Sequence, residues 1–143
     1  WETYRRRPRS LLSGVSTVLA ASLMVPIIAG PTPKAWAIAA IYAGYFVGTV
    51  PYVKTMIRKR GNRQWLIGSV TYHVLITAAA IIGWFLLHDR DLISFGVPIV
   101  AFGLLIRSFA MPISGAHRAR PWTPKQVGIL DAIFGVAVVL AAW

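Results

Sequence analysis

Residues 35–57 read AWAIAAIYAGYFVGTVPYVKTMI, and the basic segment RKRGNR follows directly at residues 58–63. A helix needs about 20 mainly apolar residues to cross a bilayer. This stretch meets that need and contains one charged residue, Lys54. Because Lys and Arg accumulate on the cytoplasmic side of membrane proteins, the pattern predicts a transmembrane helix whose last turn lies at the cytoplasmic surface.

Four further apolar stretches have the same character, at residues 11–29, 65–87, 92–113 and 124–143. Of the 143 residues, 57% are hydrophobic and 13% are charged. A soluble domain carries about a quarter charged residues, so that class is excluded. We predict an all-α, polytopic transmembrane helical bundle with five spans, which forms a single domain over residues 1–143. Pro98 lies within the fourth stretch and predicts a kink there.

The basic residues are divided unevenly between the two ends of this bundle. If the N-terminus is cytoplasmic, 13 of the 15 Lys and Arg residues lie on the cytoplasmic side, and the other two are Lys34 and Arg90. The 13 are Arg5, Arg6, Arg7, Arg9, Lys54, Arg58, Lys59, Arg60, Arg63, Arg107, Arg118, Arg120 and Lys125. The positive-inside rule therefore predicts a cytoplasmic N-terminus and a C-terminus on the outside. The net charge of +11 then reflects membrane orientation, and we expect no nucleic-acid partner.

The tryptophans favour the same topology, because indole rings prefer the headgroup level of a bilayer. Five of them fall at the predicted ends of spans: Trp36, Trp84 and Trp143 on the outer side, and Trp65 and Trp122 on the inner side.

Ionisable residues inside a membrane span are costly and are functional candidates. Apart from Lys125 at the inner edge of the last span, four lie in the predicted spans, all in the cytoplasmic half: Lys54, His73, Arg107 and Asp131. We predict that they line one polar cavity. Asp131 needs a cationic partner or a proton, and Arg107 matches its depth best, with Lys54 next. Two interpretations of the pair remain open, a structural ion pair and a substrate or proton site.

Simpler roles are also open for the cationic candidates. Lys54 and Arg107 could extend their charges to the inner headgroups. His73 could be a neutral histidine bonded to a neighbouring helix. Lys54 and Arg58 lie four residues apart and share a helix face, so a cationic surface is expected there. Its default partner is an anionic lipid headgroup, and a phosphate-bearing ligand is the more specific alternative.

Several chemistries are disfavoured by what the sequence lacks. The chain has no Cys, which excludes disulfides and thiolate-bound metals. Haem bound by two histidines would need a second His within the spans. Asp89 and Asp91 form the only acidic pair, and the predicted topology puts it on the outer side, away from the basic segments. We therefore expect no metal site and no cofactor, and an enzymatic function is disfavoured.

Small residues suggest close helix contacts. Gly44 and Gly48 form a G-x-x-x-G pattern in the second span. We expect this face to pack within the bundle, and a homodimer seam is the alternative. The first span carries Ser13, Ser16, Thr17 and Ser22, whose hydroxyls can bond to their own helix.

Four segments resemble the YwiC-like family of bacterial membrane proteins: residues 9–12, 17–24, 45–62 and 123–131. The resemblance implies a bacterial cytoplasmic-membrane protein without an assigned reaction. Family members look longer at the N-terminus, so the chain is expected to be the C-terminal part of a longer protein. Lys54, Arg58 and Asp131 fall in the resembling segments, which strengthens them as candidates.

These observations favour a membrane protein that binds or transports an anionic or lipid-like ligand in its cytoplasmic half. The candidate ligand-binding residues are Lys54, Arg58, His73, Arg107 and Asp131. An accessory subunit of a membrane complex is the alternative, with the Gly44 and Gly48 face and the Ser-rich first span as its interface to a membrane-protein partner or to a second copy of the chain. An intramembrane prenyltransferase resembling the UbiA-like enzymes is less favoured, because an inward Asp-rich motif is lacking.

Overall fold

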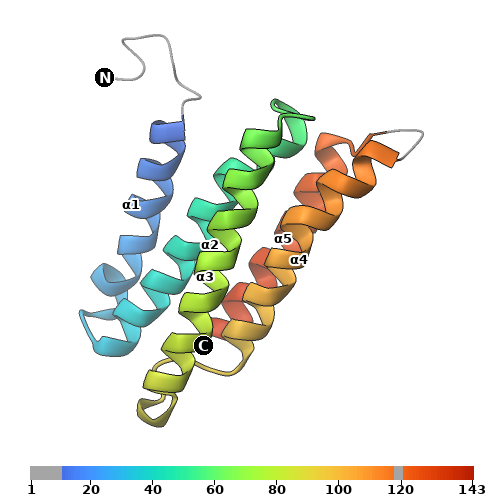
Figure 1. Ribbon diagram of the computed structural model, residues 1–143. Coiled ribbons are helices and arrows are strands. Elements are labelled where there is room, and N and C mark those ends of the chain that lie inside the picture. Colours follow the sequence, from blue (N-terminus) through green and yellow to red (C-terminus); the bar gives the residue numbers. More distant parts are fainter. Residues whose placement is uncertain (1–10, 118–120) are drawn as a thin grey trace.

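The computed structural model describes residues 11–117 and 121–143, which form five α-helices and no strand (Figure 1). The helices are α1 (Leu11–Ala29), α2 (Pro33–Ile57), α3 (Arg63–Leu87), α4 (Gly96–His117) and α5 (Pro124–Ala142). A short 3-10 helix, η1 (His88–Arg90), follows α3. All five α-helices are long and apolar enough to cross a membrane. The prediction of an all-α bundle with five spans is confirmed.

Local sequence signals determine where the helices begin. The side chains of Thr32 and Asn62 accept hydrogen bonds from the first turns of α2 and α3. Thr123 and Gln126 form a reciprocal capping box at the start of α5. These caps extend α2 and α3 two residues beyond their predicted starts at 35 and 65, since Pro33 and Arg63 directly follow a capping residue.

The fourth span differs most from its prediction. Helix α4 begins at Gly96 instead of residue 92 and continues to His117 instead of residue 113. Pro98 consequently lies in the first turn, where a backbone N–H has no partner within the helix and its loss costs little. The predicted kink at Pro98 was therefore wrong. Pro112 is the proline inside α4.

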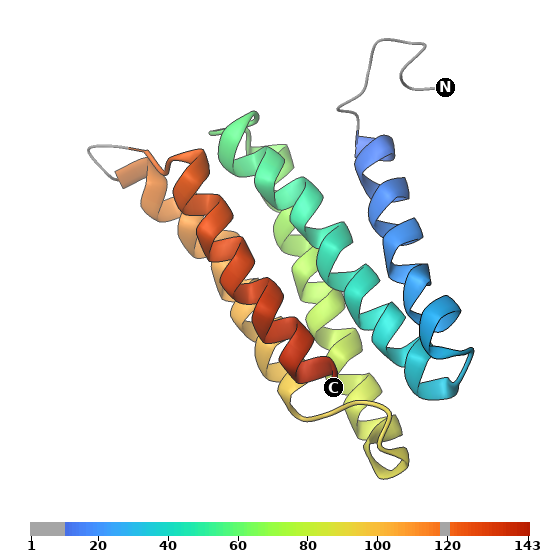
Figure 2. The same ribbon diagram turned by 180° about the vertical axis from the view of Figure 1, so that it is seen from behind.

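Helix α2 is the centre of the bundle. It packs against all four other helices, whereas α1 packs only against α2. Figures 1 and 2 show α1 on one flank and the α4–α5 pair on the opposite flank. Large apolar side chains such as Ile28, Leu86 and Leu140 are exposed on the outer faces. An apolar exterior on helices of this length is the construction of a multi-pass membrane protein.

The G-x-x-x-G face of α2 packs inside the bundle. A Cβ placed on Gly48 would lie 2.7 Å from a ring carbon of Tyr72, and one on Gly44 would lie 3.5 Å from Ile76. Tyr72 also donates a hydrogen bond to the Gly44 carbonyl at 2.8 Å. Helix α3 therefore occupies this face, as the packing interpretation predicted, and the face is not open to a second copy.

The hydroxyls of the first span partly behave as predicted. Thr17 donates to the carbonyl of Ser13, and Ser22 donates to that of Val18, both at 2.9 Å within α1.

The two ends of the bundle differ in charge. The N-terminal end of α1, the α2–α3 turn, the C-terminal end of α4 and the N-terminal end of α5 lie at one end of the bundle (Figure 1). We call it the basic end, defined by Arg58, Lys59, Arg60, Arg63 and Lys125. The opposite end carries Lys34 and Arg90 together with Asp89 and Asp91. Arg5, Arg6, Arg7, Arg9, Arg118 and Arg120 lie outside the described residues.

Candidate functional site

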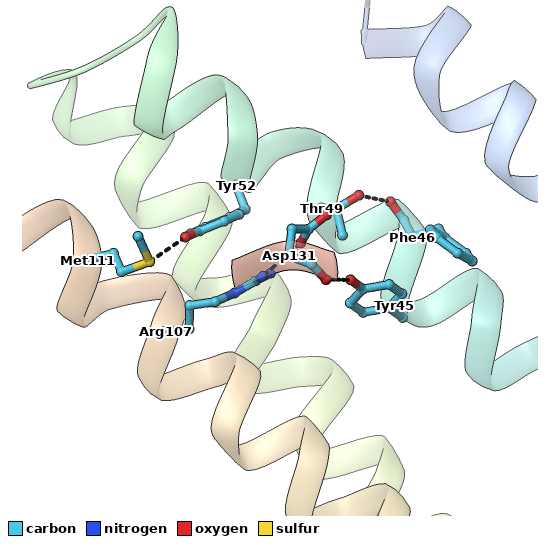
Figure 3. A network of polar contacts seen from close by, with 7 residues as sticks. All are labelled: Tyr45, Phe46, Thr49, Tyr52, Arg107, Met111 and Asp131. Atoms are coloured by element: carbon cyan, nitrogen blue, oxygen red, sulfur yellow. Dashed lines mark hydrogen bonds and ion pairs between the residues drawn. The ribbon is translucent and has the colours of Figure 1, made fainter. Parts of the chain in front are cut away.

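An ion pair joins α4 and α5 in the half of the bundle nearer the basic end. Nη1 of Arg107 lies 2.7 Å from Oδ1 of Asp131 (Figure 3). The Arg107 side chain is 2% exposed and the Asp131 side chain 27%. Arg107 is thus the partner that depth predicted for Asp131, in preference to Lys54. The alternative in which Arg107 extends to the headgroups was wrong, because its guanidinium is enclosed by protein.

Two aromatic rings pack on the Arg107 guanidinium. Its Cζ lies 4.1 Å from the centroid of the Tyr52 ring and 4.9 Å from that of Phe134. A cation near the face of an aromatic ring is stabilised by the quadrupole of the ring, most strongly where water is excluded. Helices α2 and α5 therefore each supply a ring to a cation carried by α4.

Two tyrosine hydroxyls connect α2 to the helices of the ion pair. Tyr45 donates to the backbone carbonyl of Asp131 at 2.7 Å, and Tyr52 lies 2.8 Å from the sulfur of Met111, to which it donates (Figure 3). Thr49, also shown there, bonds within its own helix to the carbonyl of Phe46. Two tyrosines of α2 therefore hold the helices that carry the ion pair. Tyr45 bonds to α5 at Asp131, and Tyr52 bonds to α4 at Met111.

Part of the Arg107 guanidinium is buried without a partner. Nε and Nη2 have no hydrogen-bond partner among residues 11–117 and 121–143 and are shielded from solvent. These two nitrogens share one edge of the guanidinium, which presents two parallel N–H groups. Such an edge has the geometry that binds two oxygens of a carboxylate or a phosphate.

His73 lies close to this cluster on α3 and is buried. Its Nδ1 is 2.7 Å from the Ser69 carbonyl, one turn earlier in the same helix. A carbonyl only accepts, so Nδ1 carries the proton. The predicted bond to a neighbouring helix is replaced by this intrahelical one. The His73 ring meets Tyr72 and Tyr52 edge-on, with centroids 5.7 and 6.4 Å apart.

Lys54 and Arg58 lie elsewhere. They line a groove of about 560 Å³ between α1 and α2, the α1–α2 groove, together with residues such as Ser13, Thr17 and Thr49. Lys54 Nζ also lies 5.6 Å from the ring centroid of Trp65. Tyr52 faces Arg107, and a residue two positions later on a helix points about 200° away. The prediction that Lys54 shares one cavity with His73, Arg107 and Asp131 was therefore wrong.

A second cavity was not predicted. It encloses about 530 Å³ between the ends of α2, α3 and α4 and the segment before α5, and we call it the basic-end cavity. Apolar side chains form most of its lining, including those of Met56, Leu66, Met111, Pro112, Ile113 and Trp122. Arg60 and Arg63 also line it. The sequence showed the charges of the basic segment at 58–63. That this segment borders an apolar cavity is visible only in the tertiary structure.

In the described parts of the chain, no three His, Asp or Glu side chains lie close enough to hold a metal ion. Asp89 and Asp91 belong to η1 and its C-cap, and η1 lies at the opposite end of the bundle from the α2–α3 turn that carries the basic segment (Figure 1).

Comparisons with known protein families, with curated proteins and with solved structures find no match for this chain. The resemblance to the YwiC-like family stays a prediction. The geometry of the basic end is therefore the ground for a functional proposal.

Proposed function

We propose that this chain is a multi-pass protein of the bacterial cytoplasmic membrane that binds an anion with an apolar body. In the complete protein or complex, this anion is transported. The ligand enters at the basic end, which faces the cytoplasm. The observation that carries the proposal is the basic-end cavity, where apolar walls and two arginines meet.

The size and lining of the cavity suit such a ligand. Cavities of about 300–1,000 Å³ with apolar walls and a few polar groups are typical of small-molecule sites. The cavity of about 530 Å³ falls within that range. Met56 and Met111 contribute flexible, polarizable walls that adapt to an alkyl or aromatic body.

The charges suit an anion. Arg60 is oriented by two bonds, from Nε to the Met56 carbonyl at 3.1 Å and from Nη2 to the Trp122 carbonyl at 2.8 Å. Its Nη1 makes no further bond to residues 11–117 and 121–143 and can donate to a ligand oxygen. Arg63 is exposed beside it, and Arg58 and Lys59 add to the positive field that attracts anions.

The orientation follows from the charge distribution. Basic residues are concentrated at one end of the bundle, and the positive-inside rule assigns that end to the cytoplasm. Anionic lipid headgroups of the inner leaflet would surround it.

The test compares three C10 probes on protein in phosphatidylcholine nanodiscs: decanoate, decanol and decyltrimethylammonium. A ligand that binds the folded state alone stabilises it by RT ln(1 + L/Kd), where L is the free ligand concentration, so at equal free concentration the tighter ligand raises the unfolding temperature more. We expect stabilisation by decanoate that exceeds the effect of the other two. The variant Arg60→Gln/Arg63→Gln should lose this difference.

The matched control is Lys34→Gln/Arg90→Gln, which removes two positive charges at the opposite end. It should keep the preference for decanoate. Equal effects of decanoate and decanol on the wild-type protein would contradict the proposal, as would an unchanged preference in Arg60→Gln/Arg63→Gln.

The two alternatives draw less support from the geometry. An accessory subunit would use the Gly44 and Gly48 face and the Ser-rich first span as its interface, and α3 covers the glycine part of it. A prenyltransferase would need its acidic residues near the cations that hold a diphosphate, and Asp89 and Asp91 lie at the other end of the bundle.

A further inference from the structure

The donors of Arg107 can be accounted for one by one. Nη1 is bound to Asp131 Oδ1. The rings of Tyr52 and Phe134 pack on the guanidinium. Nε and Nη2 remain, buried and without a hydrogen-bond partner in the described residues. A buried donor that makes no bond is destabilising, so native structures rarely keep one without a reason.

The remaining edge has a specific chemistry. Nε and Nη2 point their N–H bonds in parallel, which matches two oxygens of one carboxylate or one phosphate. A monatomic anion would accept both bonds at one atom, so the two N–H directions match two oxygens better than they match a halide. Asp131 holds Nη1, and Tyr45 holds the backbone of Asp131, so the orientation of the open edge is fixed in advance.

The residue that carries this buried edge lies one helical turn from a wall of the basic-end cavity. Met56 and Met111 line that cavity, and each is four residues from Tyr52 and Arg107 respectively. One helical turn, about 5.4 Å along the axis, thus separates the cavity wall from the cluster. The contact between the Tyr52 hydroxyl and the Met111 sulfur links a residue of the cavity wall to the ring that packs on Arg107. An unbranched methionine can change rotamer at low cost, so this contact can open.

We infer that the Nε–Nη2 edge of Arg107 is an inner oxyanion site, which takes the carboxylate or phosphate group of an anion arriving through the basic-end cavity. This inference rests on the proposed function, which supplies the path of the anion through the basic-end cavity. It adds that Arg107 recognises the carboxylate or phosphate group of that anion. The anion would occupy two successive positions, first beside Arg60 and Arg63 and then at Arg107 after Met111 moves.

Anomalous diffraction from the full chain in lipidic mesophase tests the inference without any substitution. Crystals are soaked in selenate, bromoacetate or sodium bromide, which stand for a phosphate-like anion, a carboxylate and a monatomic control. We expect an anomalous peak beside Nε and Nη2 with selenate or bromoacetate, and a weaker one or none with bromide. The stronger of the two oxyanion peaks identifies the class. A bromide peak of equal height, or no peak with any probe, would overturn the inference.

A variant gives a second readout in solution. Arg107→Lys keeps a cation for Asp131 but has no two-nitrogen edge. We expect acetate or inorganic phosphate, compared with chloride at equal ionic strength, to raise the unfolding temperature of the wild type and of Arg90→Gln but not of Arg107→Lys. Equal shifts in all three proteins would overturn the inference.

The two proposals fail in different ways. If the decanoate preference persists while the oxyanion peak is missing, the basic-end cavity binds anions and the inner site does not exist. If the peak is present while the decanoate preference is missing, Arg107 binds small oxyanions and the proposed function is wrong.

Discussion

The guanidinium of Arg107 is bound at 2.7 Å to the carboxylate of Asp131, 24 residues later in the chain, and this pair ties α4 to α5 within the apolar bundle. The rings of Tyr52 and Phe134 and the hydroxyl of Tyr45 support it from the adjoining helices. A charge enclosed in this way is costly unless it is compensated. The pair is therefore the most informative place to test the structure by substitution.

Asp131→Asn should destabilise the protein by about 3 kcal/mol, because it leaves the buried Arg107 charge uncompensated. The double variant Arg107→Met/Asp131→Leu should recover most of this loss, since it removes both charges and keeps the volume. Unfolding of purified protein in mixed micelles by increasing denaturing detergent measures both. Equal losses in the single and the double variant would show that the ion pair is not the cause.

Tyr45→Phe should cost about 1 kcal/mol of stability, the usual net value of one hydrogen bond. The lost bond is the one to the Asp131 carbonyl. Tyr42→Phe is the control, because its hydroxyl accepts from Trp143, whose side chain is exposed. A larger loss for Tyr42→Phe than for Tyr45→Phe would contradict the assignment.

Gly48→Ala should destabilise the bundle by about 1–3 kcal/mol, since the added methyl overpacks the α2–α3 contact. Its Cβ would lie 2.7 Å from Tyr72 and 3.3 Å from His73 Nε2. Gly68→Ala is the matched control, because nothing lies within 4 Å of its Cβ. The control should be neutral or stabilising, as alanine favours helix more than glycine does. A neutral Gly48→Ala would refute this packing.

Lys54→Gln/Arg58→Gln should reduce the amount of phosphatidylglycerol that co-purifies with the protein, because both cations line the α1–α2 groove. Native mass spectrometry counts the bound lipids. Arg90→Gln, at the opposite end, should retain the wild-type count. If all three proteins retain the same number of lipids, the α1–α2 groove is not a lipid site.

The five helices could be predicted because hydropathy over about 20 residues is a local property. The start of α4 could not, since Leu92–Phe95 are apolar enough to read as helix although the chain bends there. The partner of Asp131 was predictable from depth along two helices. Lys54 is separated from that pair because it lies on a different face of α2. The sequence does not indicate which face of α2 meets α4 and α5.

The basic-end cavity depends on tertiary structure most of all. Its lining comes from three helix ends and the segment that holds Trp122, so no periodicity within one helix indicates it. The sequence also did not indicate that Nε and Nη2 of Arg107 would lack a hydrogen-bond partner in the described residues. The sequence predicted a partner for the charge, and only the geometry gives the number of nitrogens left over.

Quenching of Trp122 fluorescence by 10-bromodecanoate reports whether the basic-end cavity binds an anion with an apolar body. Trp122 lines the cavity, and bromine quenches indole fluorescence only at short range. The difference between wild type and Trp122→Phe isolates this residue from the other tryptophans. We predict saturable quenching of Trp122 by 10-bromodecanoate, and an affinity about tenfold lower in Arg60→Gln/Arg63→Gln, which corresponds to about 1.4 kcal/mol. Quenching that never saturates, or that 10-bromodecanol reproduces at the same concentration, would contradict the account.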